Sequence, residues 1–244
     1  MLAYRPGHRI AYVVKHTATG FTAVHTSRTG IGGFDLALAQ DQVVAFDYDH
    51  SGKVDHFLAY RPGSRIAFVL GRSGAGFGTV TASSTGIGGF DLATAADRIV
   101  PFDYDRTGKL DALLAYRPGH RIAFVIRHTA GTSFTTAWSS FTGLPGFDLS
   151  NTRDLVTPYD YDYTGKLDHL VFYRPGGRLV GIYRKGSGAA PAAVYTGTNG
   201  IGGYDVAVAA DRIVAVDADH SGGANSLLLT RPGWKVAYIV GRRP

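Results

Sequence analysis

The sequence predicts an all-β fold, a β-propeller made of four-stranded blades, and three observations support it. An Arg-Pro-Gly phrase recurs with spacings of 56, 56, 57 and 57 residues, and the 244-residue chain holds 33 glycines and 27 Phe and Tyr residues (13 and 14). We find no amphipathic helical run, and this composition favours short strands joined by tight turns. Parallel β-helices use shorter coils, and helical solenoids show a period near 3.6 within the repeat. The repeated arginines are Arg5, Arg61, Arg117, Arg174 and Arg231.

One complete repeat shows the expected order of strands. Residues 42–46 form an apolar run, residues 54–60 alternate enough for a second strand, and residues 65–70 and 77–81 follow as the third and fourth. The turn at residues 61–64 contains Pro-Gly, which suits a type II turn because proline presets the first angle and glycine accepts the positive φ of the second. Four antiparallel strands in each repeat are typical of a propeller blade.

We expect a single repeat domain with units of approximately 1–41, 42–97, 98–154, 155–211 and 212–244. The first unit then contributes strands two to four of a blade, and the last contributes strands one to three. This arrangement allows five blades with incomplete terminal blades, or four blades with surplus strands. Exposed strand edges also invite pairing between chains, so a homo-oligomer through the open terminal blades is a further expectation.

Composition limits the classes of function. The formal charge of +6 is spread over the repeats, so we expect no nucleic-acid partner. The absence of cysteine excludes zinc-thiolate sites and cysteine nucleophiles, and no apolar stretch approaches the length of a membrane span. The chain begins inside a repeat, so we expect a fragment or an engineered piece of a longer propeller, with any export signal outside it.

An acidic loop recurs four times with the spacing that oxygen-bound cations require. We name residues 47–55, 103–111, 160–168 and 217–225 loops 1 to 4, and number the positions within each from 1 to 9. Positions 1 and 3 carry carboxylates, position 5 a hydroxyl and position 6 a glycine, and position 7 offers its backbone carbonyl. Position 9 carries a carboxylate in loops 1 to 3. The predicted ligands are Asp47, Asp49, Ser51, Lys53 and Asp55 in loop 1; Asp103, Asp105, Thr107, Lys109 and Asp111 in loop 2; Asp160, Asp162, Thr164, Lys166 and Asp168 in loop 3; and Asp217, Asp219 and Ser221 in loop 4.

Calcium is the expected cation, because it takes six to eight oxygen ligands and the glycine permits the sharp turn that gathers them. Position 12 is Leu58 in loop 1, where an EF-hand would have a bidentate glutamate, so these loops are not EF-hands. We expect loop 4 to be weakest or empty, because position 9 is Asn225. The alternative is that these aspartates form only Asx turns with their own backbone.

The motif Asp-x-Asp-x-(Ser/Thr)-Gly-x-x-Asp, followed by an apolar strand and Arg-Pro-Gly, resembles the FG-GAP/VCBS repeats of integrin-like propellers over nearly the whole chain. This resemblance implies structural calcium in the loop between a blade's first two strands. It also implies a secreted, extracellular protein that serves adhesion or carbohydrate recognition. Repeated weak sites would give such a protein avidity for clustered glycans.

Two variable columns supply candidate ligand contacts. The first follows the aromatic residue of the fourth strand, where Thr81 is the member in the second repeat, and the second column follows Arg-Pro-Gly. Aromatic members could stack on a sugar, although packing between blades is the alternative for Trp138 and Tyr195. The predicted ligand-binding residues are Trp138, Tyr195, His25, Trp234, His8 and His120.

Most charged residues belong to repeated columns, which argues against an asymmetric catalytic site. We expect the column of Arg9 and Arg65 to pair with the column of Asp35 and Asp91. Several histidines occupy the same position in two repeats, as His50 and His220 do. A site formed by two histidines therefore remains an alternative. The sequence therefore predicts a non-catalytic, calcium-stabilised, lectin-like protein that binds glycans or a glycosylated surface and has no catalytic residues. The alternatives are a scaffold without a small ligand and a secreted hydrolase.

Overall fold

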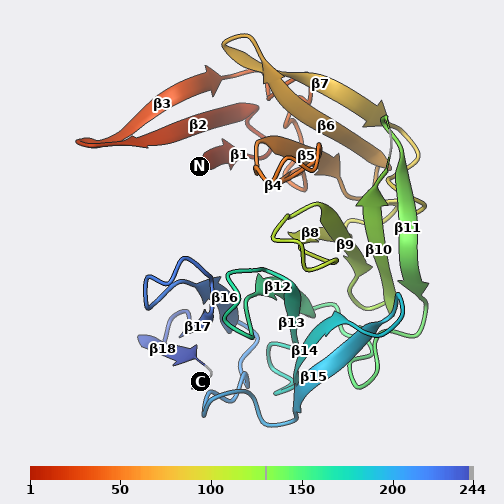
Figure 1. The fold of residues 1–244 in the computed structure, drawn as a ribbon, viewed down its shortest axis with the longest axis vertical. Helices are drawn as coiled ribbons and strands as arrows, with labels where there is room; N and C mark the ends of the chain where they lie inside the picture. The colour runs from red at the N-terminus through yellow and green to blue at the C-terminus, as the bar shows by residue number, and fades with distance from the viewer. Residues whose placement is uncertain (130, 242–244) are drawn as a thin grey trace.

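The structure is a computed structural model that describes residues 1–129 and 131–241. Five antiparallel sheets, with strands in chain order, are arranged around a common axis as the blades of a five-bladed β-propeller (Figure 1). Three sheets have four strands and the two terminal sheets have three. In the described residues no helix has the length and apolar character that crossing a membrane requires.

The first blade holds β1 (Leu2–Arg5), β2 (Ile10–Thr17) and β3 (Gly20–Ser27). The second holds β4 (Gln42–Phe46), β5 (His56–Arg61), β6 (Ile66–Ser73) and β7 (Gly76–Ser83). The third holds β8 (Arg98–Phe102), β9 (Ala112–Arg117), β10 (Ile122–His128) and β11 (Phe134–Ser140). The fourth holds β12 (Leu155–Tyr159), β13 (His169–Tyr173), β14 (Val180–Lys185) and β15 (Pro191–Gly197), and the fifth holds β16 (Arg212–Val216), β17 (Ser226–Arg231) and β18 (Val236–Gly241).

The predicted division of strands is confirmed. Strands β4, β8, β12 and β16 open their sheets and contact one another in series near the axis, whereas the first blade has no such strand (Figure 1). Within residues 1–129 and 131–241, the last blade has no fourth strand. Five sheets also decide in favour of the five-bladed alternative.

The hydrophobic cores lie between neighbouring blades. One core joins Phe46 and Leu58 of the second blade to Leu113 and Ile126 of the third, and all four side chains are buried. Strands such as β5 are buried on both faces because each sheet is covered by the next. This explains why the predicted second strand reads as an apolar run with weak alternation.

The Arg-Pro-Gly turn has the predicted conformation. The backbone NH of Ser64 donates to the carbonyl of Arg61 (3.1 Å), and Gly63 has a φ of 84°, which glycine adopts without strain. The turn directs Arg61 back toward the loop that enters its blade. There Arg61 Nε donates to Asp41 Oδ1 (2.6 Å) and Nη2 to Asp41 Oδ2 (2.9 Å), and Nη2 also contacts Asp35.

This arginine network corrects one sequence expectation. The Asp35 column pairs directly with the Arg-Pro-Gly arginine of the next blade, and not with the column of Arg9. Arg9 lies in the turn with its side chain exposed and acts on Asp35 only at longer range. The network recurs as Arg61 with Asp35 and Asp41, Arg117 with Asp91 and Asp97, Arg174 with Asp148 and Asp154, and Arg231 with Asp205 and Asp211.

Candidate functional site

Antiparallel pairing places the acidic loops and the Arg-Pro-Gly turns at opposite ends of the blades. We call these ends the acidic-loop face (loops 1 to 4) and the Arg-Pro-Gly face (the turns at residues 5–8, 61–64, 117–120, 174–177 and 231–234). On the acidic-loop face the loops converge around a cavity of about 380 Å³. Its walls are Gly52, Val54, Asp103, Gly108, Leu110, Gly165, Leu167, Asp217, Gly222, Gly223 and Ala224.

The first aspartate of each loop holds the loop's own backbone. Asp47 Oδ1 accepts from the NH of Ser51 (2.9 Å), and Oδ2 accepts from the NH of Gly52 (2.8 Å). Asp103, Asp160 and Asp217 accept from the matching two NH groups. These contacts are Asx-type turns, so this alternative holds for position 1 whether or not a cation binds.

The loop hydroxyls and lysines mostly face other protein groups. Ser51 Oγ accepts from the NH of Lys53 (3.3 Å), and Thr164 Oγ1 donates to Asp162 (3.0 Å). The ammonium of Lys109 donates to the His50 carbonyl (2.6 Å), and that of Lys166 to the Arg106 carbonyl (2.8 Å). These two lysine side chains therefore connect each loop to the preceding one.

Loop 2 offers a cation an oxygen that the protein leaves unused. Asp111 is 8% exposed, and its Oδ1 is buried without a hydrogen-bond partner. A buried, unpaired carboxylate oxygen is costly, so the donor set of loop 2 suits a calcium ion. Asp105 forms ion pairs with Lys185 Nζ (2.7 Å) and with Arg127.

The other oxygen of Asp111 belongs to a chain of hydrogen bonds that crosses from the second blade to the third. Asp111 Oδ2 lies 2.8 Å from His50 Nδ1, and His50 Nε2 lies 3.3 Å from His128 Nδ1. His128 Nε2 then donates to the Gly131 carbonyl (2.9 Å), which also accepts from the Tyr48 hydroxyl (3.0 Å). Burial raises the pKa of Tyr48, which keeps this hydroxyl protonated as a donor.

The two acceptors at the ends of this chain fix the protons of both rings. His50 Nδ1–H donates a hydrogen bond to Asp111, and His128 Nε2–H donates one to the Gly131 carbonyl. The two inner nitrogens then have room for a single proton between them. The His50 side chain is 34% exposed. This is the geometry of a carboxylate-oriented imidazole base.

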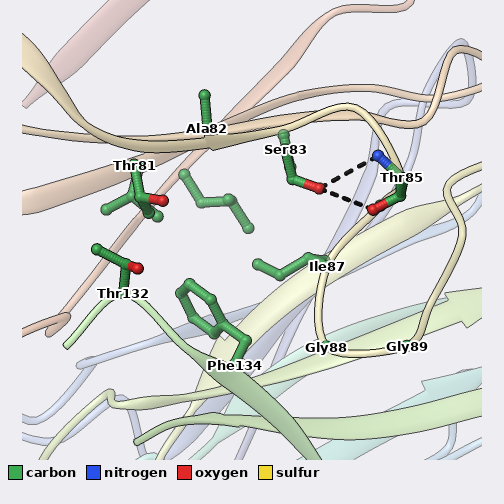
Figure 2. Close-up of a pocket in the computed structure, with 13 residues that line it drawn as sticks. Thr81, Ala82, Ser83, Thr85, Ile87, Gly88, Gly89, Thr132 and Phe134 are labelled. Carbon is green, nitrogen blue, oxygen red and sulfur yellow. Dashed lines mark hydrogen bonds between the residues drawn. The ribbon is translucent and has the colours of Figure 1, made fainter. Parts of the chain in front are cut away.

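A pocket of about 290 Å³ lies between the same two blades (Figure 2). Thr81, Ser83 and Ile87 from the second blade and its connecting loop face Thr132 and Phe134 from the third. Ser83 Oγ is bonded to Thr85, as the dashed lines show. Phe134 is shared by both features, because its ring centroid also lies 5.4 Å from that of His128.

The pocket is explained by the small residue at position 81. Thr81 belongs to the variable column that carries Trp138 in the third blade and Tyr195 in the fourth. The Trp138 ring packs against the core between the third and fourth blades, and the Tyr195 ring against the core between the fourth and fifth. This agrees with the alternative that these residues pack between blades. The short Thr81 side chain leaves the corresponding space between the second and third blades open.

The predicted ligand residues do not form one site. His8, His120 and Trp234 are exposed in the Arg-Pro-Gly turns of three different blades. His25 lies on β3, edge-on to Phe77 at 5.5 Å, and its buried Nε2 has no partner. Sequence reasoning missed the contact of His50 with His128 and that of His128 with Phe134. The only signal in the sequence was that these two positions are not histidine in every repeat. The position of His50 carries Arg106 in the next repeat, and that of His128 carries Arg72 in the repeat before it.

No protein-family model and no curated protein matches the sequence. Solved structures match over almost the entire chain. A protein from Lactobacillus plantarum has a TM-score of 0.55 at 13% identity and covers 99% of this chain. A protein provisionally named a 6-phosphogluconolactonase, from Bacteroides uniformis, has a TM-score of 0.55 at 13% identity and covers 100%. This chain spans 63% and 64% of those two chains, less than two thirds of their length.

At this identity the likeness shows the fold, a β-propeller. The prediction of a non-catalytic, lectin-like protein was nevertheless wrong, since the similar structure with a functional name is provisionally named a 6-phosphogluconolactonase and not a lectin. The prediction that no enzyme is present is corrected by the same finding. The physical reason for the error is that the sequence argument treated every repeated column as uniform. The contacts of His50 show that equivalent positions have different partners.

Proposed function

We propose that the protein is a hydrolase that cleaves a small hydroxylated ester or lactone at the interface of the second and third blades. The observation that carries this proposal is the hydrogen-bonded chain from Asp111 through His50 to His128, at the same interface as a pocket with hydroxyl side chains. The two are linked by Phe134, which lines the pocket and contacts the His128 ring. The reaction class is supported by the similar propeller that is provisionally named a 6-phosphogluconolactonase. A pocket of this volume suits a small molecule.

In the proposed reaction, His50 takes a proton from water, and the resulting hydroxide adds to the acyl carbon. The bond from that carbon to the ester oxygen then breaks, and the proton passes from the imidazole to the leaving alkoxide. A lactone yields one hydroxy acid, and an open ester yields an acid and an alcohol. Asp111 stabilises the imidazolium that forms, and His128 positions His50 from the other side.

The first test compares two histidines at the same position of the acidic loops. His50→Gln should lower kcat/KM about 100-fold or more, which is the usual contribution of a general base. His220→Gln is the matched control, because His220 occupies position 4 of loop 4 with nearly the same φ (59° against 58°). The substrates are gluconolactone, 6-phosphogluconolactone and p-nitrophenyl acetate. Absence of hydrolysis by the wild type, or equal loss in both variants, would refute the proposal.

A second variant tests whether the pocket holds the substrate. Thr81→Trp installs the residue that the third blade carries in the same column, so the fold should accept it. We expect the ring to fill the pocket and raise KM at least tenfold, with little change in thermal stability. Unchanged KM in a folded variant would separate the pocket from the reaction.

We also propose that the chain is a divergent member of the FG-GAP/VCBS repeats with structural calcium in loop 2. Support comes from the position of the acidic loops between the first two strands of each complete blade. Asp103, the Thr107 hydroxyl, the Lys109 carbonyl and Asp111 would hold the ion, and Asp105 would join them only by leaving Lys185 and Arg127. It would neutralise the loop's carboxylates and use the unpaired oxygen of Asp111.

A further inference from the structure

The residue at position 4 of loop 1 and of loop 2 reaches toward the next loop. His50 and Arg106 occupy this position in loops 1 and 2, and both have positive φ, 58° and 64°. His50 contacts position 9 of loop 2, and Arg106 contacts positions 3 and 9 of loop 3. A single substitution at position 4 therefore changes the charge inside the neighbouring loop.

In loop 3 this side chain bridges the two carboxylates that a cation would need. Arg106 Nη2 lies 2.9 Å from Asp162 Oδ2, and Arg106 Nε lies 2.7 Å from Asp168 Oδ2. The remaining oxygen of Asp168 is 2.6 Å from His169 Nδ1, and the Asp168 side chain is fully buried. Both oxygens of Asp168 are therefore in use. Charge-assisted bonds of this kind are among the stronger hydrogen bonds in proteins.

Without the arginine, loop 3 would have a suitable donor set. Ligand atoms of Asp162, Asp168 and His169 all lie within 4.8 Å of one another. A divalent ion would have to displace the guanidinium from both carboxylates and then remain beside a positive charge. Coulomb repulsion between the divalent ion and the guanidinium opposes this arrangement.

Loop 4 is satisfied in a different way. Asn225 Nδ2 donates to both oxygens of Asp219 (3.1 and 3.0 Å) and to Ser221 Oγ (2.8 Å). The amide oxygen of Asn225 accepts from Ser226 Oγ (3.2 Å), so the amide cannot turn that oxygen inward without losing a bond. The Asn225 amide group thus donates hydrogen bonds to the same oxygens of Asp219 and Ser221 that would coordinate a cation.

Loops 1 and 2 differ from these. In the described residues, the only ion pair of Asp49 or Asp55 is the one between Asp55 and His56. In loop 2, Asp111 keeps an unpaired buried oxygen. Asp105 of loop 2 does pair with Arg127 and Lys185. Among the residues that the structure describes, however, no side chain bridges positions 3 and 9 of loop 1 or of loop 2 as Arg106 does in loop 3.

We propose that Arg106 is a built-in countercation that keeps loop 3 free of metal, although its sequence matches the metal-binding pattern. The acidic loops are then not equivalent copies. Loop 3 is neutralised from within the protein by a side chain of the preceding loop. Its structural role does not depend on dissolved calcium. This inference stands independently of the proposed hydrolase activity.

The test measures calcium stoichiometry on the intact chain by calorimetry and native mass spectrometry. Arg106→Gln should gain one bound calcium per chain, and Asp162→Asn in that background should remove it again. Arg98→Gln is the charge control, because it also removes one positive charge but lies at the start of β8, on the other face. It should leave the stoichiometry unchanged. Thermal melts check that every variant is folded.

Asp162→Asn in the otherwise wild-type chain keeps the test decisive if Arg106→Gln does not fold. We expect this variant to bind as many calcium ions as the wild type. Loss of one calcium would show that loop 3 binds metal in the presence of Arg106 and would overturn the proposal. A folded Arg106→Gln protein that gains no calcium would overturn it as well.

Discussion

On the Arg-Pro-Gly face, one set of contacts recurs in four copies, whereas on the acidic-loop face four similar loops have four different sets of partners. Arg117, Arg174 and Arg231 all repeat the two-aspartate network of Arg61. In contrast, the acids of loops 2 and 3 meet His50 and Arg106, and those of loop 4 meet an amide. Both faces are built from repeated aspartates, so the type of residue alone does not distinguish them.

The difference teaches where stability and function lie in a repeat protein. A contact that recurs at each of the four junctions between consecutive blades serves what every junction needs, which is attachment of one blade to the next. A contact made at only one interface has no such general role. The pocket and the paired histidines occur together at the interface of the second and third blades. This makes the uniform face the place to test stability and the varied face the place to test chemistry.

The largest expected effect concerns the uniform face. Arg117→Ala should destabilise the protein by about 3–5 kcal/mol, because it leaves the fully buried carboxylate of Asp97 without its charged partner. Arg5→Ala is the matched control, since in the described residues Arg5 makes no ion pair and its side chain is exposed. Denaturant unfolding at pH 7 measures both. Equal losses would show that the network adds nothing specific.

Replacing one glycine on each face by alanine compares how closely the two faces are packed. Gly86 and Gly108 both have positive φ (97° and 84°), but a Cβ on Gly86 would lie 2.0 Å from the Phe90 carbonyl oxygen, and one on Gly108 meets nothing within 4 Å. Gly108→Ala should cost about 1–2 kcal/mol from its left-handed backbone. Gly86→Ala should cost at least about 2 kcal/mol more, because backbone must move. Similar unfolding midpoints would contradict the close packing of this face.

The smallest effect is the dependence of stability on pH. The Arg174 guanidinium holds the pKa of Asp148 well below its usual range, so folding favours the carboxylate. Its contribution is complete above the unfolded pKa of about 4 and is lost as pH falls toward the folded value. Asp148→Asn should therefore lower the Tm at pH 7 and flatten its decline between pH 5 and 2.

Much of the fold could be predicted because it depends on local pattern. The spacing of Arg-Pro-Gly fixed the blade length, and the run at residues 42–46 became β4 with the same bounds. The site was predicted only in part. Loop membership was correct for Asp111, but its partnership with His50 was not foreseen, since the two residues are 61 positions apart. Sequence spacing carries no information about which side chain of one repeat reaches the next.

The sequence by itself determined the repeat, the order of strands, the turns and the positions of the acidic loops, because each depends on neighbouring residues and on the preference of glycine and proline for particular angles. Only the tertiary structure decided that Arg106 bridges Asp162 and Asp168, and that Thr81 leaves a pocket where Trp138 fills the equivalent space. The reason is that such contacts arise between blades. They depend on how packed sheets bring distant positions within a few ångströms of each other.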